Sequence, residues 1–279
     1  MNAGRRRAAR LLPALAAGGL ALGLVEAQRL EGRVVEVPVR GLPELLDGLR
    51  IVHLSDLHLG SVSLNGLALR RALDWLEGRE ADLVAVTGDL LSRPRGERPL
   101  REAVRRLGAC GPVHVVLGNH DVAITRDPFS AAHEISDLEA EGAIVLRDGS
   151  TVVEVRGVRV QVAGVDPRSH LAGAAASALA DPSADLRVLL SHYPEVVDGL
   201  EPGAFPLVLA GHEHGGQICL PYPGGKLRFG GFELSPAYPE GVFELDGTTL
   251  VVSRGTGTAF VPFRYFARPE AALLVLRAR

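Results

Sequence analysis

The stretch RIVHLSDLH, residues 50–58, carries the pattern that decides the fold. An apolar run of β-strand type, Arg50–Ser55, ends in the polar triplet Asp56-Leu57-His58. Short β-branched and aliphatic runs that stop at polar or glycine-rich turns are typical of buried strands. The same succession recurs in four more places: ADLVAVTGD (81–89), PVHVVLGNHD (112–121), LRVLLSH (186–192) and PLVLAGHEH (206–214).

Outside these five places, strand and helix patterns alternate along the first half of the chain. In Leu64–Glu77, leucines and alanines recur at helical spacing on one face, and Pro99–Leu107 opens with a first-turn proline. Ser130–Glu141 and Leu171–Ala180 are further helical segments. The second half is mostly strand, so the sequence predicts a layered α/β domain with more than one sheet. The remaining predicted strands are Ala143–Leu146, Thr151–Val155, Val158–Ala163, Gly241–Leu245, Thr249–Ser253 and Ala271–Leu276.

The polar residues that close the five strands are all metal-ligand types. Since the carboxyl ends of strands in α/β sheets line the ligand crevice, we expect these side chains to meet at one edge. Oxygen and nitrogen donors in this number suit two divalent ions. Alternate residues of an extended strand point the same way, so Asp56 and His58 are expected to share one metal, and so are His212 and His214.

The order of these blocks resembles the calcineurin-like metallophosphoesterase superfamily. Its motifs are Asp-x-His, Gly-Asp, Gly-Asn-His-Asp/Glu, His and Gly-His-x-His, which this chain matches between residues 56 and 214. A wider resemblance is to the membrane-associated bacterial YkuE/YaeI-like phosphodiesterases, through Gly211–Gln217, Leu220-Pro221 and Ser253–Gly257. That branch usually has Thr between the two histidines, where this chain has Glu213. If the strand pleat continues there, Glu213 points away from the metals.

The resemblance implies a four-layer α/β/β/α sandwich of two stacked mixed sheets with a binuclear metal centre. By motif position, Asp56, His58 and His214 hold the first ion, Asn119, His192 and His212 hold the second, and Asp89 bridges both. The ions are divalent, and Mn, Fe, Zn and Mg all remain open because such donor sets accept each of them.

The implied reaction is hydrolysis of a phosphoester, more specifically a phosphodiester, by attack of a metal-bridging hydroxide. His120 is the expected proton donor to the leaving oxygen, with Asp121 orienting it. Arg254, in a glycine-rich turn, is a candidate substrate contact through its guanidinium. A phosphomonoesterase or nucleotidase of the same fold is the main alternative, and a non-catalytic scaffold is a further one. The substrate suggested by the family is phospholipid-like or an envelope phosphodiester.

Charge and composition limit the remaining classes. The 279 residues are 47% hydrophobic, which is enough for a sizeable core and excludes a disordered chain. Removing the four arginines and one acid of residues 1–27 leaves 26 basic and 32 acidic residues, a net charge of −6. An acidic body argues against nucleic acid as a partner. Two cysteines make no disulfide framework and pair only if the fold brings them together.

The N-terminus has the pattern of a targeting or anchoring segment. Arg5, Arg6, Arg7 and Arg10 precede Leu11–Val25, which contains no charged residue. Both a cleaved signal peptide and a membrane anchor fit residues 1–27. The positive-inside rule then places the body on the extracytoplasmic side, with the cytoplasmic face of the membrane as the alternative. We expect residues 28–48 to form a linker and an opening strand, and 49–279 a single domain. Lipid contact by Leu220–Phe232 is an open alternative to an ordinary surface hairpin.

Overall fold

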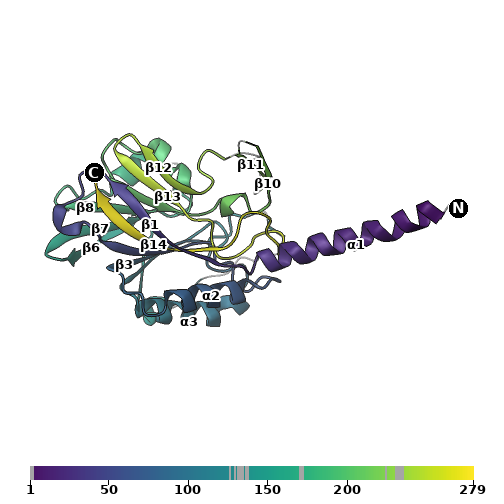
Figure 1. Cartoon of the computed structure of the whole chain (residues 1–279). Coiled ribbons are helices and arrows are strands. Elements are labelled where there is room, and N and C mark those ends of the chain that lie inside the picture. The colour runs from purple at the N-terminus through teal and green to yellow at the C-terminus, as the bar shows by residue number, and fades with distance from the viewer. Residues whose placement is uncertain are drawn as a thin grey trace.

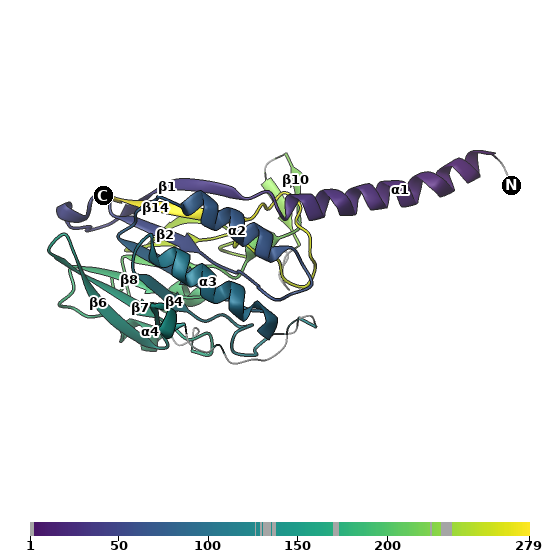
Figure 2. The same cartoon turned by 90° about the horizontal axis from the view of Figure 1, so that it is seen from below.

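Two six-stranded sheets lie face to face, and helices cover the outer face of each (Figures 1 and 2). This is the arrangement of a computed structural model that describes residues 3–125, 127–128, 130, 135, 138–169, 173–223, 225–229 and 236–279. The predicted four-layer α/β/β/α sandwich of mixed sheets is confirmed.

The first sheet carries three of the five predicted site segments at its centre. Its parallel strands β2, β3, β4 and β5 end at the same edge, which places the polar residues that follow them side by side. β14 is antiparallel to β2 and parallel to β1 on its other side. In spatial order the strands are β1 (Glu31–Val39), β14 (Glu270–Ala278), β2 (Arg50–Leu54), β3 (Leu83–Thr87), β4 (Val113–Val116) and β5 (Ala143–Val145).

The second sheet carries the other two site segments. β13, β9, β8 and β7 are parallel, and the edge strands β12 and β6 are antiparallel to their neighbours. In spatial order the strands are β12 (Gly241–Leu245), β13 (Thr248–Val252), β9 (Leu207–Ala210), β8 (Leu186–Leu190), β7 (Val158–Gly164) and β6 (Gly149–Val155). A separate hairpin consists of β10 (Cys219–Tyr222) and β11 (Gly225–Arg228).

Three apolar cores join the layers. The central core between the sheets contains Ile51, Val188 and Leu209, all at most 1% exposed. On the outer face of the first sheet, the predicted apolar stripe of α2 (Asn65–Leu76) packs together with α3 (Glu97–Gly108). The third core lies beneath α4 (Gly173–Ser177) and the 3-10 helix η4 (Pro194–Gly199).

Every strand predicted from the sequence is present, with ends that differ by a few residues. The helix predicted over Leu171–Ala180 is shorter, at Gly173–Ser177. Most of the helix predicted over Ser130–Glu141 falls outside the described residues, and the described part shows a 3-10 turn, η3, at Glu139–Glu141. Cys110 and Cys219 are both free thiols, so the fold does not pair them.

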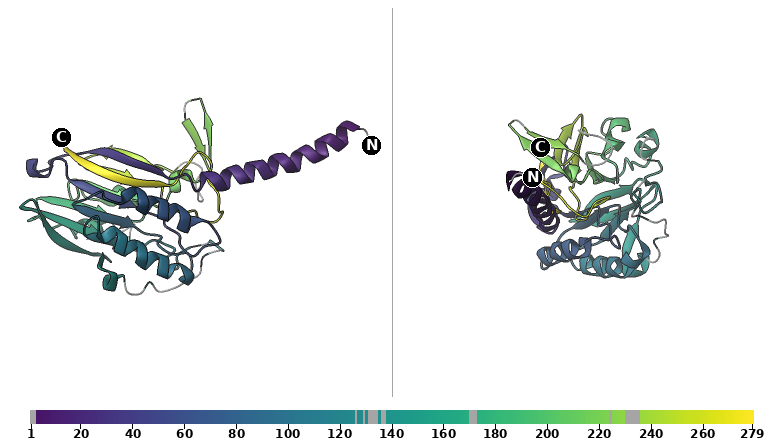
Figure 3. Two further views of the ribbon diagram at one scale, coloured as in Figure 1. Left: turned by 60° about the horizontal axis from the view of Figure 1, so that its bottom comes forward. Right: turned by 90° about the vertical axis from the view of Figure 1, so that its right-hand side faces the viewer.

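The N-terminal helix α1 (Ala3–Glu26) projects away from the body (Figures 1 and 3). Its base is tied to the segment 264–266: the Tyr265 hydroxyl donates to the Gly19 carbonyl at 2.8 Å, and the Arg264 amide donates to the Gly23 carbonyl at 3.1 Å. In the part of the chain that the structure describes, no helix is both long and apolar enough to span a bilayer, which does not support the predicted anchor.

The central core gives a matched test of the fold. Val188 on β8 is 1% exposed, whereas Val152 on β6 is 41% exposed. We expect Val188→Ala to lower the free energy of unfolding by about 2 kcal/mol, because it removes buried methyl groups and leaves a cavity. Val152→Ala is expected to change it by under about 0.5 kcal/mol. Urea denaturation measures both, and equal losses would contradict the burial assigned to β8.

Candidate metal centre

Seven predicted metal-ligand residues follow the carboxyl ends of five strands, three in the first sheet and two in the second. Because the two sheets are stacked, their ends enclose the site from both sides. Six of the seven side chains are buried, and His212 is intermediate. The residues are Asp56 and His58 after β2, Asp89 after β3, Asn119 after β4, His192 after β8, and His212 and His214 after β9.

The backbone around these residues is not the extended strand that the sequence predicted. Asp56, His58 and Asp89 have φ of 52°, 44° and 52°, and His212 and His214 have φ of 75° and 51°. The left-handed region costs a non-glycine residue roughly 1–2 kcal/mol, so such residues persist where the surrounding structure holds them. The paired residues therefore meet through sharp turns beyond the strand ends, which corrects the pleat argument.

The backbone at Glu213 is likewise not an extended strand. It sits in the turn between the two histidines with helical angles, φ −77° and ψ −12°, and its side chain is half-buried. The alternation of an extended strand therefore does not set its direction.

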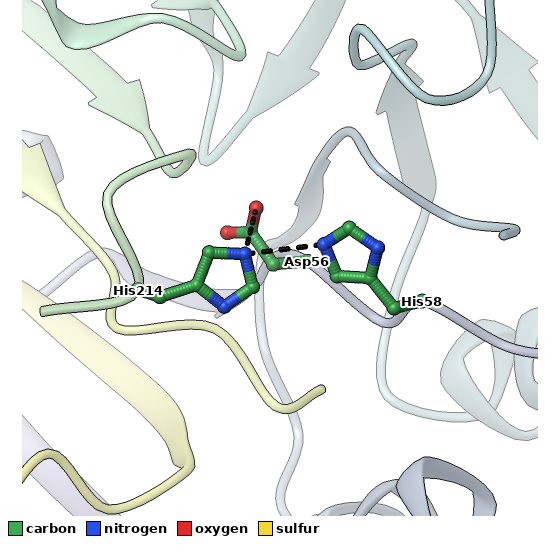
Figure 4. A group of neighbouring side chains, drawn as sticks. All are labelled: Asp56, His58 and His214. Atoms are coloured by element: carbon green, nitrogen blue, oxygen red, sulfur yellow. Dashed lines mark hydrogen bonds and ion pairs between the residues drawn. The ribbon is translucent and has the colours of Figure 1, made fainter. Parts of the chain in front are cut away.

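The first cluster consists of Asp56, His58 and His214 (Figure 4). The Nε2 atoms of the two histidines are 3.1 Å apart, and His214 Nε2 lies 3.5 Å from Asp56 Oδ1. The two ring nitrogens and the carboxylate oxygen converge on one point, and all three are atoms that bind divalent metal ions. Two nitrogens bound tetrahedrally to one ion at about 2.0–2.1 Å are roughly 3.4 Å apart. The donor set thus fits one divalent ion.

The second cluster gathers around His192. Its Nε2 is 2.9 Å from Asn119 Oδ1, 3.1 Å from His212 Nδ1 and 3.4 Å from Asp89 Oδ2. A single ring proton can satisfy only one of these neighbours, whereas a cation attracts all of them. Asp89 Oδ2 is also 3.4 Å from His58 Nε2 in the first cluster. Asp89 therefore lies between the two clusters, as a bridging ligand requires.

The pKa shifts of the buried carboxyls reflect this crowding. Burial raises the pKa of Asp56 to about 6, despite the lowering effect of His192. Burial acts on Asp89 in the same direction, but His192 and His120 outweigh it and hold its pKa well below the usual range. For His192, burial lowers the pKa and Asp89 raises it, with a net value of about 10. The positive charge of His192 thus favours the ionised form of both carboxyls.

His120 lies at the rim of these clusters. Its Nε2 is 3.8 Å from Asp89 Oδ2 and 3.1 Å from Thr125 Oγ1, and its Nδ1 is 3.0 Å from Ser130 Oγ. Its ring meets the ring of His58 edge-on, with centroids 4.6 Å apart. Two hydroxyl partners thus fix the ring plane next to the bridging carboxylate.

Asp121 acts on the backbone. Its carboxylate accepts hydrogen bonds from the amides of Leu90, Leu91 and Gly118 at 2.8 to 3.1 Å. Burial and the neighbouring Asp89 raise its pKa to about 7. Asp121 therefore fastens the turn that carries Asp89 to the turn that carries Asn119 and His120.

Arg254 has an ion-pairing role inside the protein. It is 7% exposed, its Nη2 lies 2.7 Å from Glu270 Oε2 and 3.1 Å from Glu31 Oε2, and its Nε lies 3.5 Å from Glu240 Oε2. Its guanidinium is directed to these three carboxylates, and its predicted contact with a substrate phosphate stays a prediction.

Arg264 was not among the residues singled out from the sequence, and it is fully buried beside the first cluster. Its guanidinium donates to the carbonyls of His214 and Ala267 at 3.1 and 2.9 Å, and also to the carbonyls of Arg254, Gly255 and Gly257. Its Nη2 is 3.2 Å from His214 Nδ1. One side chain thus holds together the two loops that frame His214. A single Arg in an aromatic stretch has no spacing signature that would reveal this.

Arg264→Met should destabilise the protein severely, because five buried carbonyls lose their shared donor. We expect the free energy of unfolding to fall by about 3 kcal/mol or more. The matched control is Arg105→Met on α3, whose side chain is 56% exposed and which should cost under about 0.5 kcal/mol. Urea denaturation in excess chelator separates this effect from metal binding, and a loss below 1 kcal/mol would contradict the role assigned to Arg264.

Comparisons with known proteins agree with this geometry. The chain is similar to the uncharacterised metallophosphoesterase YkuE of Bacillus subtilis, 29% identical over 95% of this chain and 94% of that protein. It is 28% identical to YkoQ of the same organism, over 80% of this chain and 81% of YkoQ. A zebrafish (Danio rerio) transmembrane protein with a metallophosphoesterase domain is 31% identical over 91% of this chain and 59% of its own length.

The family model described as calcineurin-like phosphoesterase matches residues 49–216, which span all five site segments and more than half of the chain. The protein therefore belongs to the calcineurin-like phosphoesterase family.

Proposed function

We propose that this metal-dependent phosphoesterase is a phosphodiesterase with two divalent ions. Asp56, His58 and His214 would hold the first ion, Asn119, His192 and His212 the second, and Asp89 both. The observation that carries the proposal is the position of the Asp89 carboxylate, 3.4 Å from His58 on one side and 3.4 Å from His192 on the other.

Bound divalent ions would lower the pKa of a water toward 7 and neutralise charge on the phosphate. The protein's own part is to place the proton donor. His120 Nε2 lies beside Asp89, with Thr125 and Ser130 fixing the ring, so it can transfer a proton to the leaving oxygen. Asp121 keeps this loop in place through backbone amides.

The charge around the site favours a diester over a monoester. A phosphate monoester carries close to two negative charges at neutral pH, and a diester carries one. Two nearby guanidiniums, those of Arg254 and Arg264, are engaged by carboxylates and carbonyls of the protein. Neither guanidinium is therefore left to neutralise a second substrate charge.

We further propose that the substrate is a phospholipid-like or envelope phosphodiester and that the chain works at the membrane or outside the cytoplasm. The four arginines ahead of an uncharged helical segment support this location. The names of some relatives, from zebrafish and cattle, include the word transmembrane.

The metal centre is tested by Asp89→Asn, which keeps the shape and removes the charge. We expect about two divalent ions per wild-type chain after refilling with Mn²⁺, and at least one fewer in the variant. Hydrolysis of bis(p-nitrophenyl) phosphate should fall by about 100-fold or more, and wild type should prefer it to p-nitrophenyl phosphate. Metal analysis and the two chromogenic assays measure these quantities.

Asp181→Asn, which alters a carboxylate paired with Ser183 on the surface, is the matched control and should retain metal and activity. A folded wild-type protein that binds no metal would overturn the metal centre. A faster monoesterase than diesterase rate would overturn the substrate class alone.

The proton donor is tested by His120→Gln. We expect the metal content to stay unchanged and kcat to fall by about 10²- to 10⁴-fold for a diester with an alkyl leaving group. For p-nitrophenolate, which departs with little protonation, the loss should be much smaller. Equal losses for both leaving groups would assign His120 to metal or phosphate binding instead.

A further inference from the structure

The hairpin β10–β11 belongs to neither sheet, and one of its faces is apolar. Directly opposed residues of an antiparallel pair lie on the same face, and so do alternate residues of each strand. The register pairs Leu220 with Leu227, and the Phe229 amide continues it by donating to the Ile218 carbonyl at 2.8 Å. Four large side chains therefore share one face: Leu220, Tyr222, Leu227 and Phe229.

These side chains are exposed by 54%, 56%, 40% and 41%, in that order. The other face holds the hairpin against the body. Cys219 is fully buried there, and Lys226 and Arg228 form ion pairs with Glu240 at 3.1 and 3.3 Å. Because the polar face is held against the body by these ion pairs, the apolar face of the hairpin is exposed to solvent.

The root of the hairpin adjoins the base of α1 (Figures 1 and 3). Tyr265 joins the two: its carbonyl accepts from the Cys219 amide at 2.8 Å, and its hydroxyl donates to Gly19 of α1 at 2.8 Å. More apolar surface lies on α1 and on the segment 264–266 that holds its base. Leu20, Leu22, Val25 and Phe266 are each exposed by 47% to 57%.

We propose that the apolar face of this hairpin rests on an anionic lipid bilayer. The first ten residues carry four arginines and no acid, which complements the negative surface of such a bilayer. Four half-exposed side chains of this size offer about 400 Å². A stable dimer needs about 800 Å² from each partner and close shape complementarity, whereas insertion into lipid needs neither. The proposal is independent of the phosphoester chemistry.

Vesicle binding of the full-length chain tests the proposal. Vesicles of phosphatidylcholine and phosphatidylglycerol in equal amounts are sedimented with wild type, Leu227→Glu and the matched control Val152→Glu. Leu227 and Val152 are exposed by 40% and 41%, so neither change should disturb the core. We expect Leu227→Glu to lower the partition coefficient by about fivefold or more and Val152→Glu to leave it within about twofold.

A second measurement locates the contact even where α1 dominates binding. In Phe229→Trp, the new indole should be quenched by brominated lipid, while wild type, with Trp75 alone, and Val152→Trp should not be. A bound but unquenched Phe229→Trp overturns the proposal, whatever the partitioning of Leu227→Glu. So does a concentration-dependent dimer in sedimentation velocity that Leu227→Glu abolishes, since it identifies a second copy as the occupant.

Discussion

The buried carboxylate of Asp89 is the charge around which the residues of the candidate metal centre are arranged. It lies within 3.4 to 3.8 Å of three imidazole rings that come from both sheets. A carboxylate closed off from water is costly unless cationic or hydrogen-bonding groups surround it. Those groups can reach it only if β3 of one sheet and β8 of the other end at the same depth. The site around Asp89 can therefore form only when the two sheets are stacked.

The sequence predicted the strands well because strands depend on local patterns, and the residues predicted as metal ligands lie near one another at the strand ends. Apolar runs with polar ends mark a strand and the edge at which it stops, as in RIVHLSDLH. The path of the chain after β2 and β9 was predicted wrongly. Asp56 and His58 both adopt the left-handed conformation, which brings their side chains together in a tight turn. Such a turn produces no periodic pattern in the sequence.

Long-range partners explain the remaining differences. Arg254 lies in a glycine-rich turn, where an arginine can contact a phosphate. In the structure its guanidinium forms ion pairs with Glu31 on β1 and Glu270 on β14. Arg264 donates hydrogen bonds to carbonyls up to 50 residues away in the sequence, and these bonds define its structural role. Such roles depend on which backbone groups the fold leaves unpaired, and this is decided by tertiary structure.

The pairing of β1 with β14 has a consequence for the order in which the protein forms. β14 is the last strand of the chain and lies between β1 and β2, pairing with both. Until β14 has left the ribosome, β1 has no neighbour in the sheet and β2 lacks one of its two. The half-made chain therefore cannot close its first sheet, and contacts between its two ends, more than 230 residues apart, come last. Completion of the first sheet therefore has to follow the synthesis of β14.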